Sequence, residues 1–120
     1  MGINKDLGLP FGKGMEKVAI CFDVDGTLIH DNHINFETRT LLDWFVAQKW
    51  KNVDVIVWSG GGADYARSKI RLILPPIEEK VKFYSKLEYK AIRAKYDKII
   101  AIDDVQDTRL GDINLIVRNK

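Results

Sequence analysis

Cysteine is almost absent from this sequence, because Cys21 is the only one among 120 residues. A disulfide within the chain is therefore excluded, and a reducing compartment such as the cytoplasm is the expected location. Cys21 lies inside an apolar run, so we expect a buried structural thiol rather than a reactive one.

Long apolar segments and an excess of one charge are also missing. No apolar run approaches the roughly 20 residues that cross a bilayer, and residues 1–15 lack the apolar core of a secretory signal. The net charge is only +2, which is too small to indicate a nucleic-acid-binding protein, although it leaves room for a local basic face. We therefore predict a cytoplasmic protein that does not enter membranes.

The composition that remains is typical of one globular domain. Hydrophobic residues make up 46% of the chain and charged residues 30%, which argues against disorder. A chain of 120 residues has enough material for one core and little for a second module. We expect a glycine-rich extension over residues 1–15 and a single domain over residues 16–120.

Apolar runs typical of strands alternate with segments of helical periodicity. This order predicts an α/β protein with three layers, a Rossmann-like fold and a mainly parallel five-stranded sheet. Asn35 is the expected N-cap of the first helix, Pro75 should end the second, and residues 29–35 are expected to be an irregular loop over the site entrance. The expected strands are 18–22, 53–58, 81–84, 98–102 and 113–117, and the expected helices are 36–50, 63–74 and 87–96.

Two carboxylates follow the first apolar run, in V-A-I-C-F-D-V-D-G-T-L. Asp23 and Asp25 are two residues apart, so their side chains can lie on the same side of an extended backbone. Like charges so close imply a cation between them, or a division of labour between a nucleophile and a general acid and base. An EF-hand calcium loop is excluded, because Cys21 would occupy its first ligand position and Asn32 its bidentate glutamate.

Other polar residues come directly after the later strands, and ligands of an open parallel sheet bind at that edge. Ser59, beside Gly60 and two further glycines, can hold a phosphate oxygen. Lys86 can reach back over the strand ends, and Lys82 is the second choice for this role. The adjacent pair Asp103 and Asp104 should divide its work, one as a metal ligand and one as an anchor for the lysine.

The chain resembles the haloacid dehalogenase (HAD-like) superfamily of phosphohydrolases in four motifs. They are D-x-D-x-T-L after the first strand, Ser59 after the second, the lysine Lys86, and the D-D pair near the end of the chain. The order of the motifs excludes response-regulator receivers, because their acidic pair comes at the first strand and their lysine near the last. Here D-x-D comes first and D-D comes last. The resemblance implies a Mg²⁺-dependent phosphatase. Asp23 would be the nucleophile that forms a phosphoaspartate, and Asp25 the general acid and base. The resemblance also implies that Mg²⁺ is held by the Asp23 carboxylate, the Asp25 backbone carbonyl and Asp104, supported by Asp103, and that phosphate is bound by Ser59, Gly60 and Lys86.

The spacing of the motifs leaves no room for the cap domain of larger relatives. The resemblance therefore implies an open site for a bulky or exposed phosphomonoester, on a monomer or a homo-oligomer. Two alternatives stay open. A nucleic-acid end-processing phosphatase is suggested by the basic residues Arg67, Lys69 and Arg71, and a non-catalytic module could retain the fold to bind phosphate or metal. Asp107 follows Asp104 with one residue fewer between them than is usual in the family.

Overall fold

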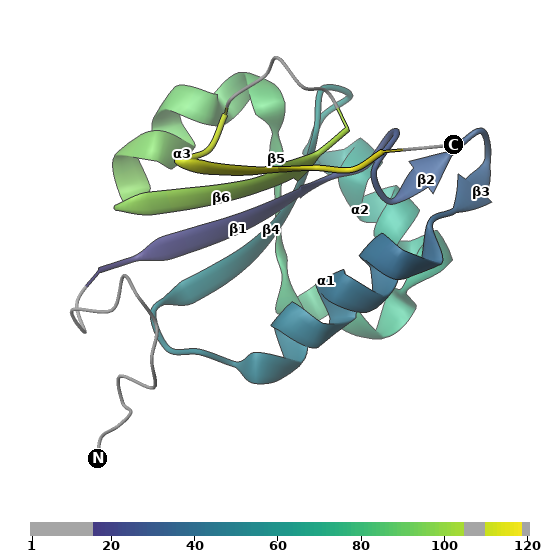
Figure 1. Ribbon diagram of the computed structural model, residues 1–120, viewed down its shortest axis with the longest axis horizontal. Helices are drawn as coiled ribbons and strands as arrows, with labels where there is room; N and C mark the ends of the chain where they lie inside the picture. The colour runs from purple at the N-terminus through teal and green to yellow at the C-terminus, as the bar shows by residue number, and fades with distance from the viewer. Residues whose placement is uncertain (1–15, 105–109, 119–120) are drawn as a thin grey trace.

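The computed structural model describes residues 16–104 and 110–118, and a five-stranded parallel sheet forms its centre (Figure 1). The strand order is β5-β4-β1-β6-β7. Every pair of neighbours is parallel, so all carboxyl ends meet at one edge. The strands of this sheet are β1 (Val18–Asp23), β4 (Val53–Ser59), β5 (Lys82–Ser85), β6 (Lys98–Asp103) and β7 (Ile113–Ile116).

Helices cover both faces of this sheet (Figure 1). The larger core lies between one face and the helices α1 (Phe36–Gln48) and α2 (Ala63–Ile73), and α3 (Tyr89–Lys95) covers the other face. Among the described residues, no helix combines the length and the apolar character that a membrane span requires. The prediction of an α/β protein with a five-stranded parallel sheet is thus confirmed, and the layers are compatible with a Rossmann-like fold.

β1 is the central strand, and all six of its residues are buried. It pairs with β4 on one side and with β6 on the other, which explains why its sequence shows no polar alternation. Cys21 is fully buried in this strand, and burial raises the pKa of its thiol to about 12. The expectation of a structural thiol is therefore confirmed.

Residues 29–35, expected to be irregular, instead contain a small hairpin. β2 (Ile29–His30) and β3 (His33–Ile34) pair in antiparallel fashion. Asp31 and Asn32 connect them with φ values of 50° and 63°. Asn and Asp tolerate this left-handed backbone, which two-residue hairpin turns require. The expectation was wrong because strands of two residues are too short to show periodicity.

The other differences from the expected elements are small. Pro75 and Pro76 do end α2, but the chain continues as the 3₁₀ helix η1 (Pro75–Lys80). The helix expected over residues 87–96 is divided into the 3₁₀ turn η2 (Lys86–Glu88) and α3.

The N-cap of α1 offers a test of how local sequence contributes to stability. The Asn35 side chain accepts hydrogen bonds from the backbone N–H groups of Glu37 and Thr38, at 3.1 and 3.2 Å. We expect Asn35→Ala to lower the free energy of unfolding by about 1 kcal/mol in urea denaturation, because both donors lose their acceptor. Asn35→Asp keeps an acceptor and should remain close to the wild type. Equal losses in the two variants would contradict a capping role.

Candidate functional site

The register of the central strands brings Asp23 and Asp103 side by side. Phe22 of β1 lies opposite Ile102 of β6, so the next residue of each strand is a carboxylate on the same face of the sheet. Asp23 and Asp103 are 6% and 2% exposed. Two neighbouring carboxylates are therefore buried together at the carboxyl edge, which requires a compensating positive charge.

Lys86 supplies that charge. It is the first residue of η2, directly after β5, and its ammonium group lies 2.8 Å from Asp23 and 2.6 Å from Asp103. Lys82, the second choice from the sequence, lies at the opposite end of β5 and pairs with Asp54 at 2.9 Å. The structure thus brings Lys86 to the carboxylates and leaves Lys82 at the other edge of the sheet.

The shifts in pKa show that one lysine does not fully balance this cluster. Burial raises the pKa of Asp23 to about 6, although the hydrogen bond and positive charge of Lys86 act to lower it. Burial and the neighbouring Asp103 raise the pKa of Asp104. For Lys86, burial disfavours the charged form, but the hydrogen bonds to Asp103 and Asp23 outweigh it and raise the pKa. The cluster holds more negative charge than the half-buried Lys86 compensates.

The same carboxylates can hold a metal ion. Asp23, Asp103 and Asp104 each place one carboxylate oxygen within 4.8 Å of the other two. Three carboxylates and the single ammonium of Lys86 leave two negative charges, which a divalent cation would balance. Gly26, with φ of 85°, allows this approach, because a Cβ atom there would collide with the Asp104 carboxylate. Oxygen donors of this kind suit a hard cation.

Asp25 lies outside the group of three carboxylates. The chain bends after Asp23, and the Asp25 side chain is exposed and accepts a hydrogen bond from the Tyr65 hydroxyl at 2.7 Å. This hydrogen bond raises the pKa of Tyr65, because losing the phenolic proton would place a second negative charge beside the carboxylate. Tyr65 was not among the site residues predicted from the sequence. The only signal was its position in the first turn of the helix that follows Ser59 and the glycines.

Ser59 ends β4 and is 2% exposed. Its hydroxyl oxygen accepts a hydrogen bond from the backbone N–H of Gly61 at 2.9 Å, which orients the hydroxyl group and leaves its proton to be donated. Gly60 is exposed in the turn between Ser59 and α2. Thr27, another buried hydroxyl, donates to Asp23 at 3.3 Å. Two hydroxyl groups are thus held at the carboxyl edge.

A cavity of about 520 Å³ opens beside these groups. It is lined by Asp25 and Asp104, by His30 of the β2–β3 hairpin, and by Tyr65 and Lys69 of α2. The Lys69 ammonium lies 5.3 Å from the centre of the Tyr65 ring. The cavity therefore joins acidic groups to one cation and one aromatic ring.

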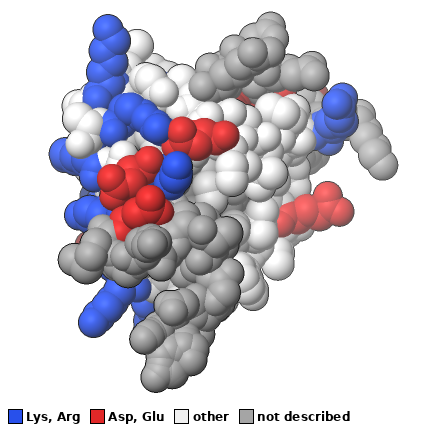
Figure 2. Space-filling model, turned by 60° about the vertical axis from the view of Figure 1, so that its left-hand side comes forward, with Lys and Arg blue, Asp and Glu red and all other residues white. Residues whose placement is uncertain are grey.

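The basic residues of α2 are mostly engaged within the protein. Arg67 and Arg71 both pair with Glu78, at 3.1 and 2.6 Å. On the side of the molecule that Figure 2 presents, Lys and Arg side chains lie next to Asp and Glu side chains, beside a broad uncharged area. Asp107 lies outside the described residues, as do residues 1–15.

No protein-family model matches this chain, and neither does any curated protein or any solved structure. The resemblance to the haloacid dehalogenase superfamily therefore remains a prediction from its four short motifs. What the structure adds is the arrangement of the motif residues in space.

The raised pKa of Asp23 predicts how stability depends on pH in metal-free protein. Between pH 3.8 and about 6 the folded state keeps a proton that the unfolded state has lost. The free energy of unfolding should thus fall by about 3 kcal/mol as the pH rises through this range. Mg²⁺ should raise the melting temperature at neutral pH, and this gain should disappear below about pH 6, where protons compete for Asp23.

Asp23→Asn provides the matched test, with Asp43→Asn on the exposed surface of α1 as its control. The amide that replaces the Asp23 carboxylate cannot ionise, so this variant should be more stable than the wild type without metal at neutral pH and should gain little from Mg²⁺. Thermal unfolding from about pH 4 to about pH 8 measures both effects. An Asp23→Asn variant with the wild-type response to Mg²⁺ would exclude Asp23 as a ligand.

Proposed function

We propose that this protein is a Mg²⁺-dependent phosphohydrolase that acts on an exposed phosphomonoester through a phosphoaspartate on Asp23. One observation carries the proposal. The buried carboxylate of Asp23 contacts Lys86 and belongs to a group of three carboxylates that could hold a cation, while a separate carboxylate, that of Asp25, lines the cavity. Nucleophile, cation site and proton carrier are separate groups in this arrangement, as phosphoryl transfer through a covalent intermediate needs.

In the first step, an Asp23 carboxylate oxygen forms a bond to phosphorus, and the bond from phosphorus to the leaving oxygen breaks. Asp25 gives its proton to that oxygen, so the alcohol leaves neutral. In the second step, Asp25 takes a proton from water. The water oxygen bonds to phosphorus, the bond to Asp23 breaks, and inorganic phosphate is released. Asp25 then carries the proton needed for the next turnover.

The remaining side chains stabilise charge on the transferred group. Lys86 and the Ser59 hydroxyl lie at the same sheet edge as Asp23 and can donate to the phosphoryl oxygens. Asp23, Asp103 and Asp104 would hold Mg²⁺, which supplies charge neutralisation for the phosphate and the nucleophile. Asp103 also positions Lys86, because the hydrogen bond from the Lys86 ammonium to Asp103 fixes the orientation of the lysine side chain.

The substrate class follows from the cavity. It is open to solvent, so the leaving group can extend out of the protein. Arg67 and Arg71 pair with Glu78, so Lys69 is the one of the three basic residues that lines the cavity. This supports a phosphomonoester of another kind over a nucleic-acid substrate, because contacts to a phosphate backbone need several available cations.

The decisive experiment is phosphate release from an aryl phosphate and a panel of natural phosphoesters. We expect turnover that requires Mg²⁺, stops with EDTA and falls by roughly 10⁴-fold or more in Asp23→Asn, because the nucleophile is lost. Asp43→Asn should behave as the wild type. Metal binding without turnover over the whole panel would favour the non-catalytic module, and equal activity of the wild type and Asp23→Asn would refute the mechanism.

Tyr65→Phe tests the assignment of Asp25. The variant keeps the aromatic ring beside Lys69 but loses the hydroxyl that donates to Asp25. We expect kcat to fall by roughly tenfold with KM nearly unchanged, because the acid and base loses its orientation while the substrate contacts remain. Leu72→Ala, which changes a side chain of α2 that is 71% exposed, is the control. A change confined to KM would instead make Tyr65 a substrate-binding residue.

A further inference from the structure

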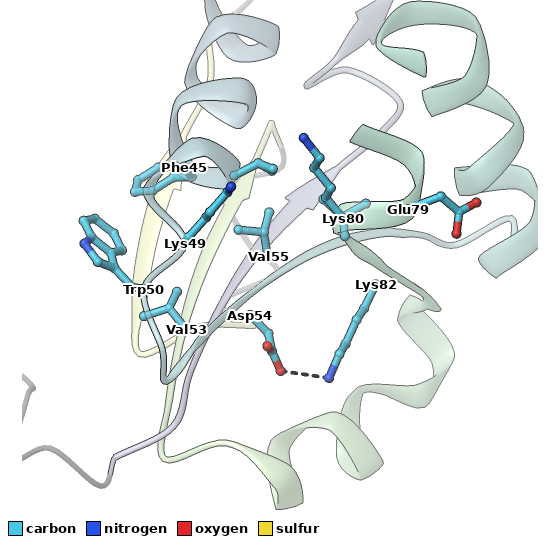
Figure 3. A pocket seen from close by; sticks show the side chains of 11 residues that line it. Phe45, Lys49, Trp50, Val53, Asp54, Val55, Glu79, Lys80 and Lys82 are labelled. Carbon is cyan, nitrogen blue, oxygen red and sulfur yellow. Dashed lines mark hydrogen bonds and ion pairs between the residues drawn. The ribbon is translucent and has the colours of Figure 1, made fainter. Parts of the chain in front are cut away.

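A second cavity, of about 340 Å³, lies at the opposite edge of the sheet (Figure 3). It is bounded by the C-terminal end of α1 and by the first residues of β4 and β5. Val53 lies here and Ser59 lies at the carboxyl edge, and the rise of about 3.3 Å per strand residue separates the two ends of β4 by about 20 Å. This cavity therefore has no part in the chemistry proposed above.

Two lysines at this cavity have no partner among the described residues. The side chains of Lys49 and Lys80 lean toward one another from α1 and from the end of η1 (Figure 3). No hydrogen bond or ion pair involves either of them within residues 16–104 and 110–118. Both lysines are exposed, and an oxyanion bound between them could pair with two cations at once.

The acidic residues of the cavity do not provide this compensation. Asp54 accepts hydrogen bonds from Lys82 at 2.9 Å and from Tyr96 at 2.6 Å. Burial acts to raise the pKa of Asp54, but these two hydrogen bonds outweigh it and lower the pKa. Glu79 is 88% exposed and lies 4.0 Å from Arg67. The two free ammonium groups therefore give the cavity a positive side.

Apolar side chains also line the cavity, and Phe45 and Trp50 lie on the same side of it as Lys49 (Figure 3). Phe45 and Trp50 pack edge to face, with ring centroids 6.3 Å apart, and valine side chains of β4 lie next to them. Flat rings bind well against such aromatic walls. The volume is at the lower end of the range for small-molecule sites, which limits a ligand to one or two rings.

The backbone of Lys49 is a further observation. Lys49 is the C-cap of α1 and has φ of 53° and ψ of 39°, the left-handed conformation in which glycine is preferred. Lys49 thus occupies a position whose backbone conformation favours glycine. From these features together we propose that the cavity binds a small aromatic oxyanion, with its charge between Lys49 and Lys80 and its ring against Phe45 and Trp50.

The test uses 2-naphthoate as the probe and neutral 2-naphthamide as its matched partner, followed by ¹H–¹⁵N NMR on the full chain. We expect 2-naphthoate to shift the Trp50 indole N–H and the amides of residues 49–55 and 79–82. The indole signal of Trp58, which is fully buried elsewhere in the core, should not move. The amide should bind at least about tenfold more weakly, because it cannot pair with the lysines.

Lys49→Gly and Lys80→Ala should each weaken 2-naphthoate binding by about fivefold, and the double variant should bind it no better than the neutral amide. Lys51→Ala, an exposed lysine that does not line the cavity, should bind as the wild type does. Because glycine suits the backbone at position 49, the melting temperature of Lys49→Gly should not fall with its affinity. Three outcomes would overturn the proposal: equal affinity for both probes, an equal loss of affinity in Lys51→Ala, or chemical-shift changes confined to the cavity that Asp25 lines.

Discussion

One ammonium group, that of Lys86, holds together carboxylates that would otherwise repel each other at the centre of the sheet. It reaches Asp23 and Asp103 at 2.8 and 2.6 Å, from a turn that β5 places beside them. Even so, burial keeps the pKa of Asp23 at about 6. The cluster is a local destabilisation that the apolar core on both faces of the sheet must offset, and a cation bound to these carboxylates would relieve it.

The parallel sheet separates two kinds of chemistry along the same strands. At the carboxyl edge of the sheet the side chains are acidic and hydroxylic, and three of the carboxylates could hold a metal ion. At its amino edge, Lys49 and Lys80 line a cavity together with apolar side chains. Because all strands run the same way, each edge collects residues from segments far apart in the sequence, and the two sites stay independent of one another.

The features that the sequence predicted correctly depend on local patterns. Apolar runs located the five strands of the sheet, Asn35 located the start of α1, and Pro75 located the end of α2. Lys86 was preferred over Lys82 because only one of them follows a strand, and the structure brings that one to the carboxylates. Each of these signals lies within a few residues of the feature that it predicts.

What the sequence did not predict depends on contacts between distant segments or on very short ones. The hydrogen bond from Tyr65 to Asp25 joins residues 40 positions apart, and no pattern near either of them announces it. The β2–β3 hairpin has strands of two residues, which are too short for any periodicity. The cavity at the amino edge likewise forms only when α1, β4 and β5 meet, so it has no motif of its own.

The central position of β1 also has a consequence for how the chain folds. β1 precedes both of its neighbours in the sequence, and the two strands that cover its edges begin at Val53 and Lys98. During synthesis β1 cannot form backbone hydrogen bonds along both of its edges until β6 has been made. Sheets assembled from strands so distant in the sequence fold slowly, through intermediates that expose apolar surface and are prone to aggregate. The apolar residues of β1 are therefore the part of a newly made chain that has to avoid aggregation until β6 pairs with them.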